Sequence, residues 1–149
     1  MAIARGAGTE IIRSISLATV DGAISNLIIG VQHHIYTVLS VICYAQAVQA
    51  SGNYVNMRLL GYDSKAGTTD INHYIFRQDM LQQESFVWND KFSFNGFEPT
   101  NFTGPMDDAT KQDAIADQGS SVVQKLQIYS EHVDDNFDVI CTYIDQNNS

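Results

Sequence analysis

Short runs of alternating or β-branched apolar residues follow one another along almost the whole chain, separated by Gly, Asn, Asp and Ser. Alternation places successive side chains on opposite faces of the backbone, which is typical of a half-buried strand and not of a helix. Eight short strands with turn residues between them favour an all-β sandwich or a barrel. The expected strands cover residues 9–20, 22–31, 34–47, 53–61, 70–77, 84–95, 120–132 and 136–146.

Size and charge limit the class of protein further. A chain of 149 residues with 44% hydrophobic residues can form one domain with a core between two sheets. Its 17 acidic and 8 basic residues give a net charge of −9, which opposes binding to a phosphate backbone or to an anionic membrane. We therefore expect one β-sandwich domain over residues 1–149, with neither a nucleic-acid nor a membrane partner.

The start of the chain and its cysteines indicate a cellular compartment. MAIARGAGTE lacks the apolar segment of a secretory signal, so we expect a soluble protein made in a cytoplasm. The window HIYTVLSVICYAQAV is too short and too polar to cross a bilayer as a helix. Cys43 and Cys141 are too few for a disulfide framework or a zinc site, and we expect two buried thiols.

The run 34–47 is apolar on both of its faces, which predicts that both faces are covered, by the core or by a neighbouring subunit. With uninterrupted alternation, one face carries Ile35, Leu39, Val41 and Cys43. The opposite face, which we expect to form a subunit interface, carries Tyr36, Val38, Ile42 and Tyr44.

The stretch ESFVWNDKFSF places an acidic residue, Asp90, in the middle of an apolar face. Counting by twos, that face carries Phe86, Trp88, Phe92 and Phe94. Asp90 is either a catalytic carboxylate in an aromatic pocket or part of a bend. A buried, unpaired carboxylate costs several kcal/mol. We therefore favour one extra residue, which forms a bulge, turns Asn89 and Asp90 toward water and returns the next aromatic residues to the core.

Residues 96–119 form an unusually long connection, a kind of segment that is often functional or disordered. Asp107 and Asp108 are placed to cap a short helix over ATKQDAIADQ, which ends at Gly119. The apolar residues Phe97, Phe102 and Met106 are costly to leave in water, so we expect them to dock on this subunit or on a partner.

The sequence provides no recognisable catalytic or metal-binding pattern. His33 and His34 are adjacent and would point to opposite faces of a strand, while His73 and His132 stand alone. A nucleophile elbow and a phosphate-binding loop are both missing. We expect no catalytic residue, no metal and no cofactor. An aromatic platform for sugar stacking is one alternative, which would consist of Trp88, Tyr36, Tyr44 and Tyr54.

Four parts of the chain carry a resemblance to a known class. They are GTEIIRSISLATVDG; HIYTVLSVICYAQA with NYVNMRLLGYDS; HYIFRQDMLQQESFVWNDKFSF; and DNFDVICTYIDQ. Together they resemble small β-sandwich virion proteins of tailed bacteriophages, especially those of cyanophages and other marine phages. The likeness rests on strand and turn patterns, and residues 96–119 depart from the short connection usual in that class. It implies an eight-stranded antiparallel β-sandwich, jelly-roll-like, that is a structural part of the virion.

Within that class we expect a non-enzymatic capsid decoration or cement protein on the capsid surface of a virion. It would bind the major capsid protein as a homo-oligomer, and a trimer is the favoured state. An acidic body, an apolar face and extended segments suit this role. The segments are an N-terminal arm, residues 1–8, and the loop 96–119. The expected partner contacts are Ile3, Arg5, Phe97, Pro99, Phe102 and Met106.

Two other functions remain open for the same fold. One is a tail-associated adaptor, baseplate part or receptor-binding protein, and the other is a carbohydrate-binding module that uses the aromatic platform. A jelly-roll strand order would also place the expected third and eighth strands side by side, which would bring Cys43 and Cys141 close together.

Overall fold

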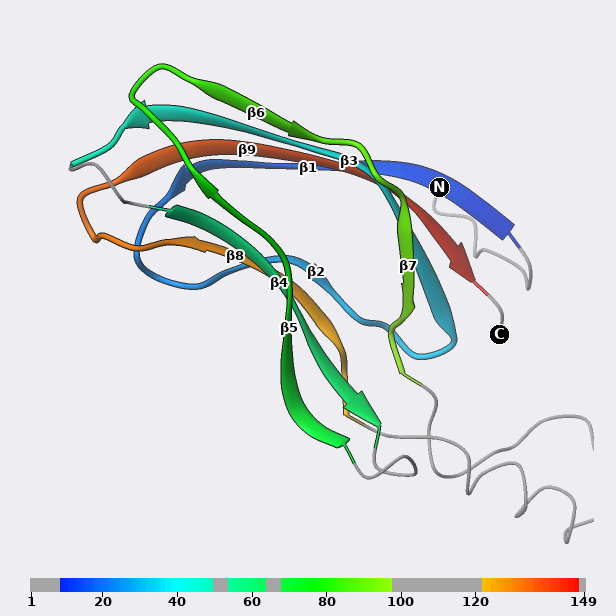
Figure 1. Cartoon of the computed structure of the whole chain (residues 1–149). Coiled ribbons are helices and arrows are strands. Elements are labelled where there is room, and N and C mark those ends of the chain that lie inside the picture. The colour runs from blue at the N-terminus through cyan, green and yellow to red at the C-terminus, as the bar shows by residue number, and fades with distance from the viewer. Residues whose placement is uncertain (1–8, 50–53, 64–67, 98–121, 148–149) are drawn as a thin grey trace, which may run out of the picture.

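The computed structural model describes residues 9–49, 54–63, 68–97 and 122–147 (Figure 1). Within these ranges every helix or strand assigned is a strand, which confirms the all-β prediction. The strands are β1 (Thr9–Val20), β2 (Ser25–Ile29), β3 (His34–Ala47), β4 (Tyr54–Asp63), β5 (Thr68–Asp79), β6 (Ser85–Trp88), β7 (Phe92–Asn95), β8 (Lys125–Ser130) and β9 (Asn136–Asn147).

The strands form two antiparallel sheets that pack face to face, as the two layers of Figure 1 show. One sheet has the order β1-β9-β3-β6, with β7 also paired to β3, and the other has the order β2-β8-β4-β5. If β6 and β7 are counted as the one strand expected from the sequence, successive strands alternate between the sheets except for β4 and β5, which are neighbours in one sheet. This is the strand order of a jelly roll. The fold is therefore the β-sandwich that the sequence predicted.

The core lies between the two layers. Val38, Val41 and Val139 from the first sheet are fully buried, as are Met57 and Ile128 from the second. Burying a side chain of this kind contributes about 1.5–3 kcal/mol. Aromatic residues close one side of the core, where the ring of Phe76 on β5 lies 5.0 Å from that of Phe86 and 5.7 Å from that of Trp88.

The bend predicted at Asp90 is confirmed. Trp88 pairs with Val41, and Phe92 pairs with Val38. The segment from Trp88 to Phe92 is therefore one residue longer than the segment of β3 that lies opposite it. This difference is the one extra residue that the sequence predicted. Residues 89–91 are exposed, and Phe92 and Phe94 of β7 return to the inner side of the sheet. Asp90 is a surface residue of a turn.

A bulge in β3 overturns the prediction that Tyr36, Val38, Ile42 and Tyr44 share one face. The register with β9 shifts between Val38 and Ser40, so the inward-facing positions change from even to odd numbers. Tyr36 and Val38 are consequently buried in the core, while Ile42 and Tyr44 remain exposed on the outer face. The prediction from strict alternation was wrong here, because one extra residue moves every later side chain of the strand to the opposite face of the sheet.

A backbone junction joins the two sheets at the base of the connection between β7 and β8. The N–H of Gly96 donates to the carbonyl of His34 at 2.8 Å, and that of Gln124 donates to the carbonyl of Gly96 at 3.0 Å. Gly30 N–H in turn donates to Gln124 at 2.8 Å. A Cβ on Gly96 would lie 2.1 Å from the carbonyl oxygen of Val31, so only glycine permits this approach. We call this the Gly96 junction.

Candidate functional site

The outward faces of the two sheets differ in chemistry, and each is a candidate functional surface. The outer face of the β1-β9-β3-β6 sheet, here called the apolar face, presents branched aliphatic side chains. The outer face of the β2-β8-β4-β5 sheet, here called the polar face, presents tyrosine, arginine and amide side chains.

Strand register places the exposed aliphatic residues of the apolar face in rows. Ile140 on β9 pairs with Ile42 on β3, which pairs with Val87 on β6. These three side chains are 43%, 40% and 53% exposed. Ile12, also exposed, pairs with the half-buried Ile144 in a second row. Directly opposed residues in neighbouring strands have Cβ atoms about 4.5–5.5 Å apart, so each row is a continuous apolar surface.

Charge is almost missing from the apolar face. Among its paired positions in the described strands, Glu10 and Asp138 carry charges, and they lie toward opposite ends of the β1–β9 pair. A shallow depression of about 330 Å³ adjoins the first row, between Ser16, Gln46 and Ile140, and Asp138 is among its lining residues. Depletion of charge around exposed apolar residues is characteristic of the centre of protein–protein interfaces.

Two cross-strand rows also organise the polar face. The first, from β8 through β4 to β5, is Tyr129, Asn56 and Arg77. The second, from β2 through β8 and β4 to β5, is Asn26, Gln127, Arg58 and Tyr74. The cluster is not visible in the sequence, because its residues come from four strands that only the sheet order brings together.

The amide groups of the polar face are held by hydrogen bonds. Arg58 Nε donates to Gln127 Oε1 at 3.0 Å, and Gln127 Nε2 donates to Asn26 Oδ1 at 3.0 Å. Asn56 and Gln127 are only 1% and 7% exposed. Neighbouring side chains therefore cover both amides. Buried amides with partners make a rigid floor, because loss of one partner leaves a costly unsatisfied group.

The tyrosines of the polar face interact with each other and with arginines. The hydroxyls of Tyr74 and Tyr129 are 2.9 Å apart, and the Arg58 guanidinium lies 5.3 Å from the Tyr129 ring centroid. Hydrogen bonds from Tyr129 and Arg58 lower the pKa of Tyr74, whereas burial raises that of Tyr129. Arg77 lies 4.3 Å from the Tyr54 ring centroid. Such cation–π contacts fix both guanidinium groups over rings.

A depression of about 340 Å³ opens on the polar face, lined by Asn56, Tyr74, Arg77, Tyr129 and Glu131. Asn56 Nδ2 donates to Glu131 Oε1 at 3.0 Å, and Arg77 contacts the same oxygen at 3.2 Å. The depression therefore combines aromatic rings, a carboxylate and a guanidinium, which are groups that can bind a polar ligand.

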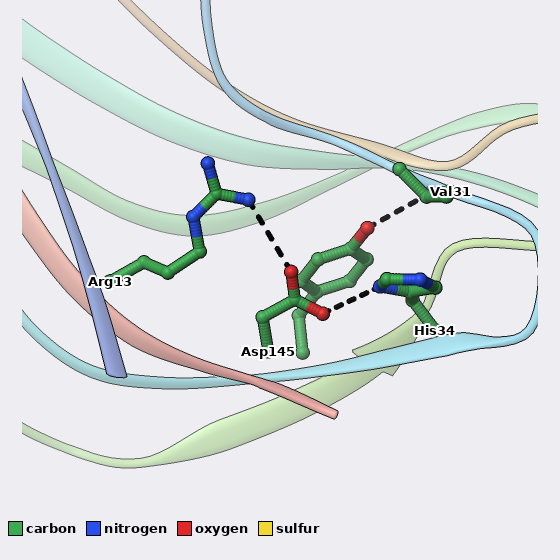
Figure 2. A network of polar contacts seen from close by, with 5 residues as sticks. Arg13, Val31, His34 and Asp145 are labelled. Atoms are coloured by element: carbon green, nitrogen blue, oxygen red, sulfur yellow. Dashed lines mark hydrogen bonds and ion pairs between the residues drawn. The ribbon is translucent and has the colours of Figure 1, made fainter. Parts of the chain in front are cut away.

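A buried carboxylate near the end of the sandwich joins three strands of one sheet (Figure 2). Asp145 on β9 is 2% exposed, with Oδ1 2.6 Å from His34 Nδ1 on β3 and Oδ2 3.4 Å from Arg13 on β1. Beside it, burial raises the pKa of Tyr36 to about 12, although the hydroxyl accepts a hydrogen bond from Val31 N–H at 2.9 Å. His34 is thus the partner of a buried carboxylate, and its ring is largely covered.

Both cysteines are free and fully buried, as predicted. Cys43 pairs with Val139, two residues from Cys141 on the same inner face, so the jelly-roll order does bring the thiols near each other. Burial raises the pKa of each thiol to about 12, with a smaller contribution from Cys141 to that of Cys43. Neither group is therefore a ready thiolate nucleophile.

The structure does not assemble the expected sugar-stacking platform. Trp88 and Tyr36 lie in or against the core, Tyr44 lies on the apolar face, and Tyr54 is on β4 in the opposite sheet. The tyrosines that do meet, Tyr74 and Tyr129, were not in the expected set. Alternate polar positions in the neighbouring strands β4 and β8 are the signal that could have found them.

Most of the expected partner contacts lie outside the described residues. These are Ile3, Arg5, Pro99, Phe102 and Met106, together with the arm 1–8 and the short helix expected after Asp108. Phe97 is described and half-buried, and its carbonyl accepts a hydrogen bond from His33 N–H at 3.0 Å.

A search of the described residues finds no group of three or more His, Cys, Asp or Glu side chains that could hold a metal ion. In the same residues, no helix has the length and apolar character needed to cross a membrane. The chain matches no family model and no curated protein. Among solved structures, a match is found to Bacillus endospore appendages, described as a novel family of disulfide-linked pili. Identity is 10% and the TM-score is 0.46, over 100% of this chain and 97% of the other, which assigns no function.

Proposed function

We propose that this chain is a non-enzymatic structural protein of a bacteriophage virion, which binds the exterior of the head as a homo-oligomer. The observation that supports this proposal is the apolar face. Its central row, from Ile140 through Ile42 to Val87, is exposed, and one charged residue, Asp138, lies in the adjacent outward position of β9. In a chain with a net charge of −9, an apolar sheet face whose described strands carry only two charged residues, Glu10 and Asp138, is suited to contact with another copy of the same chain.

The energy available from such a contact is adequate for an oligomer. Burying the exposed half of an Ile or Val side chain contributes about 1 kcal/mol. A patch that includes Ile12, Ile42, Val87 and Ile140 from each subunit therefore supplies several kcal/mol per interface, against the entropic cost of association. A closed trimer would bury this patch in every subunit and leave the polar faces free.

A head-decoration role agrees with the remaining features. The resemblance of the strand and turn patterns to phage virion proteins supports it, as does an acidic chain that is repelled by packaged DNA. Repeated weak contacts over a shell would stabilise the head without any chemical step. The residues expected to contact the major capsid protein come from the N-terminal arm and from the connection after Phe97.

The self-association is tested by light scattering coupled to size-exclusion chromatography. Ile42→Lys places a charge in the centre of the apolar row, and we expect it to yield monomers from an oligomeric wild type. Leu81→Lys is the matched control, because Leu81 is more exposed but lies in a turn. A monomeric wild type, or equal oligomerisation of both variants, would contradict the proposal.

The virion role is tested by adding the purified protein to undecorated phage heads. We expect saturable binding at a fixed ratio to the major capsid protein, and loss of this ratio with the Ile42→Lys variant. Absence of binding to undecorated heads would contradict the decoration role. If gels of whole virions show only a few copies per particle, the chain belongs in the tail as an adaptor or baseplate part.

A further inference from the structure

We propose that the depression on the polar face binds a neutral saccharide through a pair of neighbouring hydroxyl groups. This activity goes beyond the structural role, and it uses the sheet face that the proposed oligomer leaves free. The residues that carry it are Glu131, Arg77, Tyr74 and Tyr129, with Asn56 as the floor.

The first argument concerns hydrogen-bonding groups. Asn56 and Arg77 both contact Oε1 of Glu131, and among the described residues no contact to Oε2 is recorded. Oε2 is thus an acceptor for an added group. The guanidinium of Arg77 has five N–H donors, so donors remain after the contact with Glu131. An acceptor next to a donor matches two neighbouring sugar hydroxyls, each of which can donate and accept.

The second argument concerns the aromatic rings. Tyr74 is half exposed and Tyr129 is half buried, and their hydroxyls are 2.9 Å apart. Only one of the two hydroxyl hydrogens is used in the bond between these tyrosines, so the other is left to donate to a ligand. An exposed tyrosine ring offers an apolar surface with a polar tip, which suits the mixed surface of a sugar ring.

Rigidity of the groups around the depression lowers the cost of binding. Asn56 is buried and bonded to Glu131, while Arg58 is held by Gln127 and by the ring of Tyr129. Side chains that are already fixed lose little conformational entropy when a ligand arrives. A volume of about 340 Å³ is at the lower end of the range for small-molecule pockets, which is about 300–1,000 Å³.

The charge balance favours a neutral ligand over an anionic one. Glu131 pairs with Arg77, and the nearby Arg58 donates to Gln127 and lies over the ring of Tyr129. The net charge of −9 on the whole chain repels anions further. A cation is disfavoured as well, because Glu131 is the one carboxylate among the residues that line the depression.

An array of immobilised neutral and acidic glycans tests the proposal with the full-length chain. We expect the wild type to bind a subset of neutral glycans, and both Glu131→Gln and Tyr74→Ala to reduce that signal at least tenfold. Asp90→Asn makes the same carboxylate-to-amide change in an exposed turn and should bind like the wild type. Far-ultraviolet circular dichroism and thermal melting of each variant confirm that it is folded.

Three outcomes would overturn the inference. They are no binding to any neutral glycan, binding restricted to acidic glycans that disappears at high salt, and neutral-glycan binding that both variants retain. The oligomeric state is measured on the same samples, so failure of saccharide binding is separable from failure of self-association. Isothermal titration with the best neutral glycan from the array would then measure the affinity.

Discussion

Replacing Gly96 with alanine tests whether the Gly96 junction is a main determinant of stability. The new Cβ would lie 2.1 Å from the carbonyl oxygen of Val31 and 2.5 Å from its amide nitrogen. Real Cβ atoms essentially never come closer than 3.0 Å to such atoms. Both atoms in contact belong to the backbone, so no side chain can rotate away and the two segments must separate.

The expected loss of stability follows from the backbone hydrogen bonds of the Gly96 junction. Separation strains the hydrogen bonds from Gly96 to His34, from Gln124 to Gly96 and from Gly30 to Gln124, which are 2.8, 3.0 and 2.8 Å long. A typical hydrogen bond contributes about 1 kcal/mol, and overpacking costs about 1–3 kcal/mol. We expect Gly96→Ala to lower the free energy of unfolding by about 3 kcal/mol, or the melting temperature by about 6–12 °C.

Urea unfolding followed by circular dichroism measures the change, and Gly61→Ala is the matched control. A Cβ at Gly61 would lie 3.5 Å from the side chain of Gln124 and 3.7 Å from the carbonyl of Ile71, which are ordinary contacts. This control should be neutral or stabilised by up to about 1 kcal/mol. Equal stabilities of the two variants would refute the steric argument.

Three further predictions concern stability. Each thiol has a pKa raised from 9.0 to about 12 in the folded chain, so stability should fall above about pH 9, as the unfolded chain loses these protons first. Urea unfolding at several pH values measures how the free energy of unfolding falls with pH, and this slope should be about 1.4 kcal/mol per pH unit smaller for Cys43→Ala. An unchanged slope would contradict a raised pKa of the Cys43 thiol. Gln83→Gly should stabilise the fold by about 0.5 kcal/mol, because φ is 66° there; a destabilised variant on urea unfolding would count against this. Asp145→Asn should cost about 2–3 kcal/mol by the same assay, whereas Asp90→Asn should change stability by less than about 0.5 kcal/mol.

The strands were predictable because alternation is a local property of the sequence. The expected bounds 9–20 and 34–47 coincide with β1 and β3, and the break near Asp90 followed from the cost of burying a carboxylate. The bulge after Val38 was not predictable, because no charged or turn-forming residue marks it. The bulge exchanges the inner and outer faces of the first half of β3. Two of the four expected interface residues, Tyr36 and Val38, are therefore in the core.

The polar face was missed for a different reason. β4 and β8 each contribute two alternating polar or aromatic residues, such as Asn56 and Arg58 on β4, and such a pair by itself looks like a solvent-exposed side. Only the strand order brings Gln127 and Tyr74 into one row with Arg58. The composition of this surface therefore depends on how distant strands pair, and it cannot be predicted from the sequence of a single strand.

The Gly96 junction has a consequence for how such a chain can change over evolution. Because Gly96 and Gln124 are bonded to each other, the two ends of the segment 98–121 meet at one anchored point of the body. Insertions, deletions or wholesale replacement between them need not disturb the register of any strand. The length and sequence of that segment can thus diverge while the scaffold is inherited unaltered.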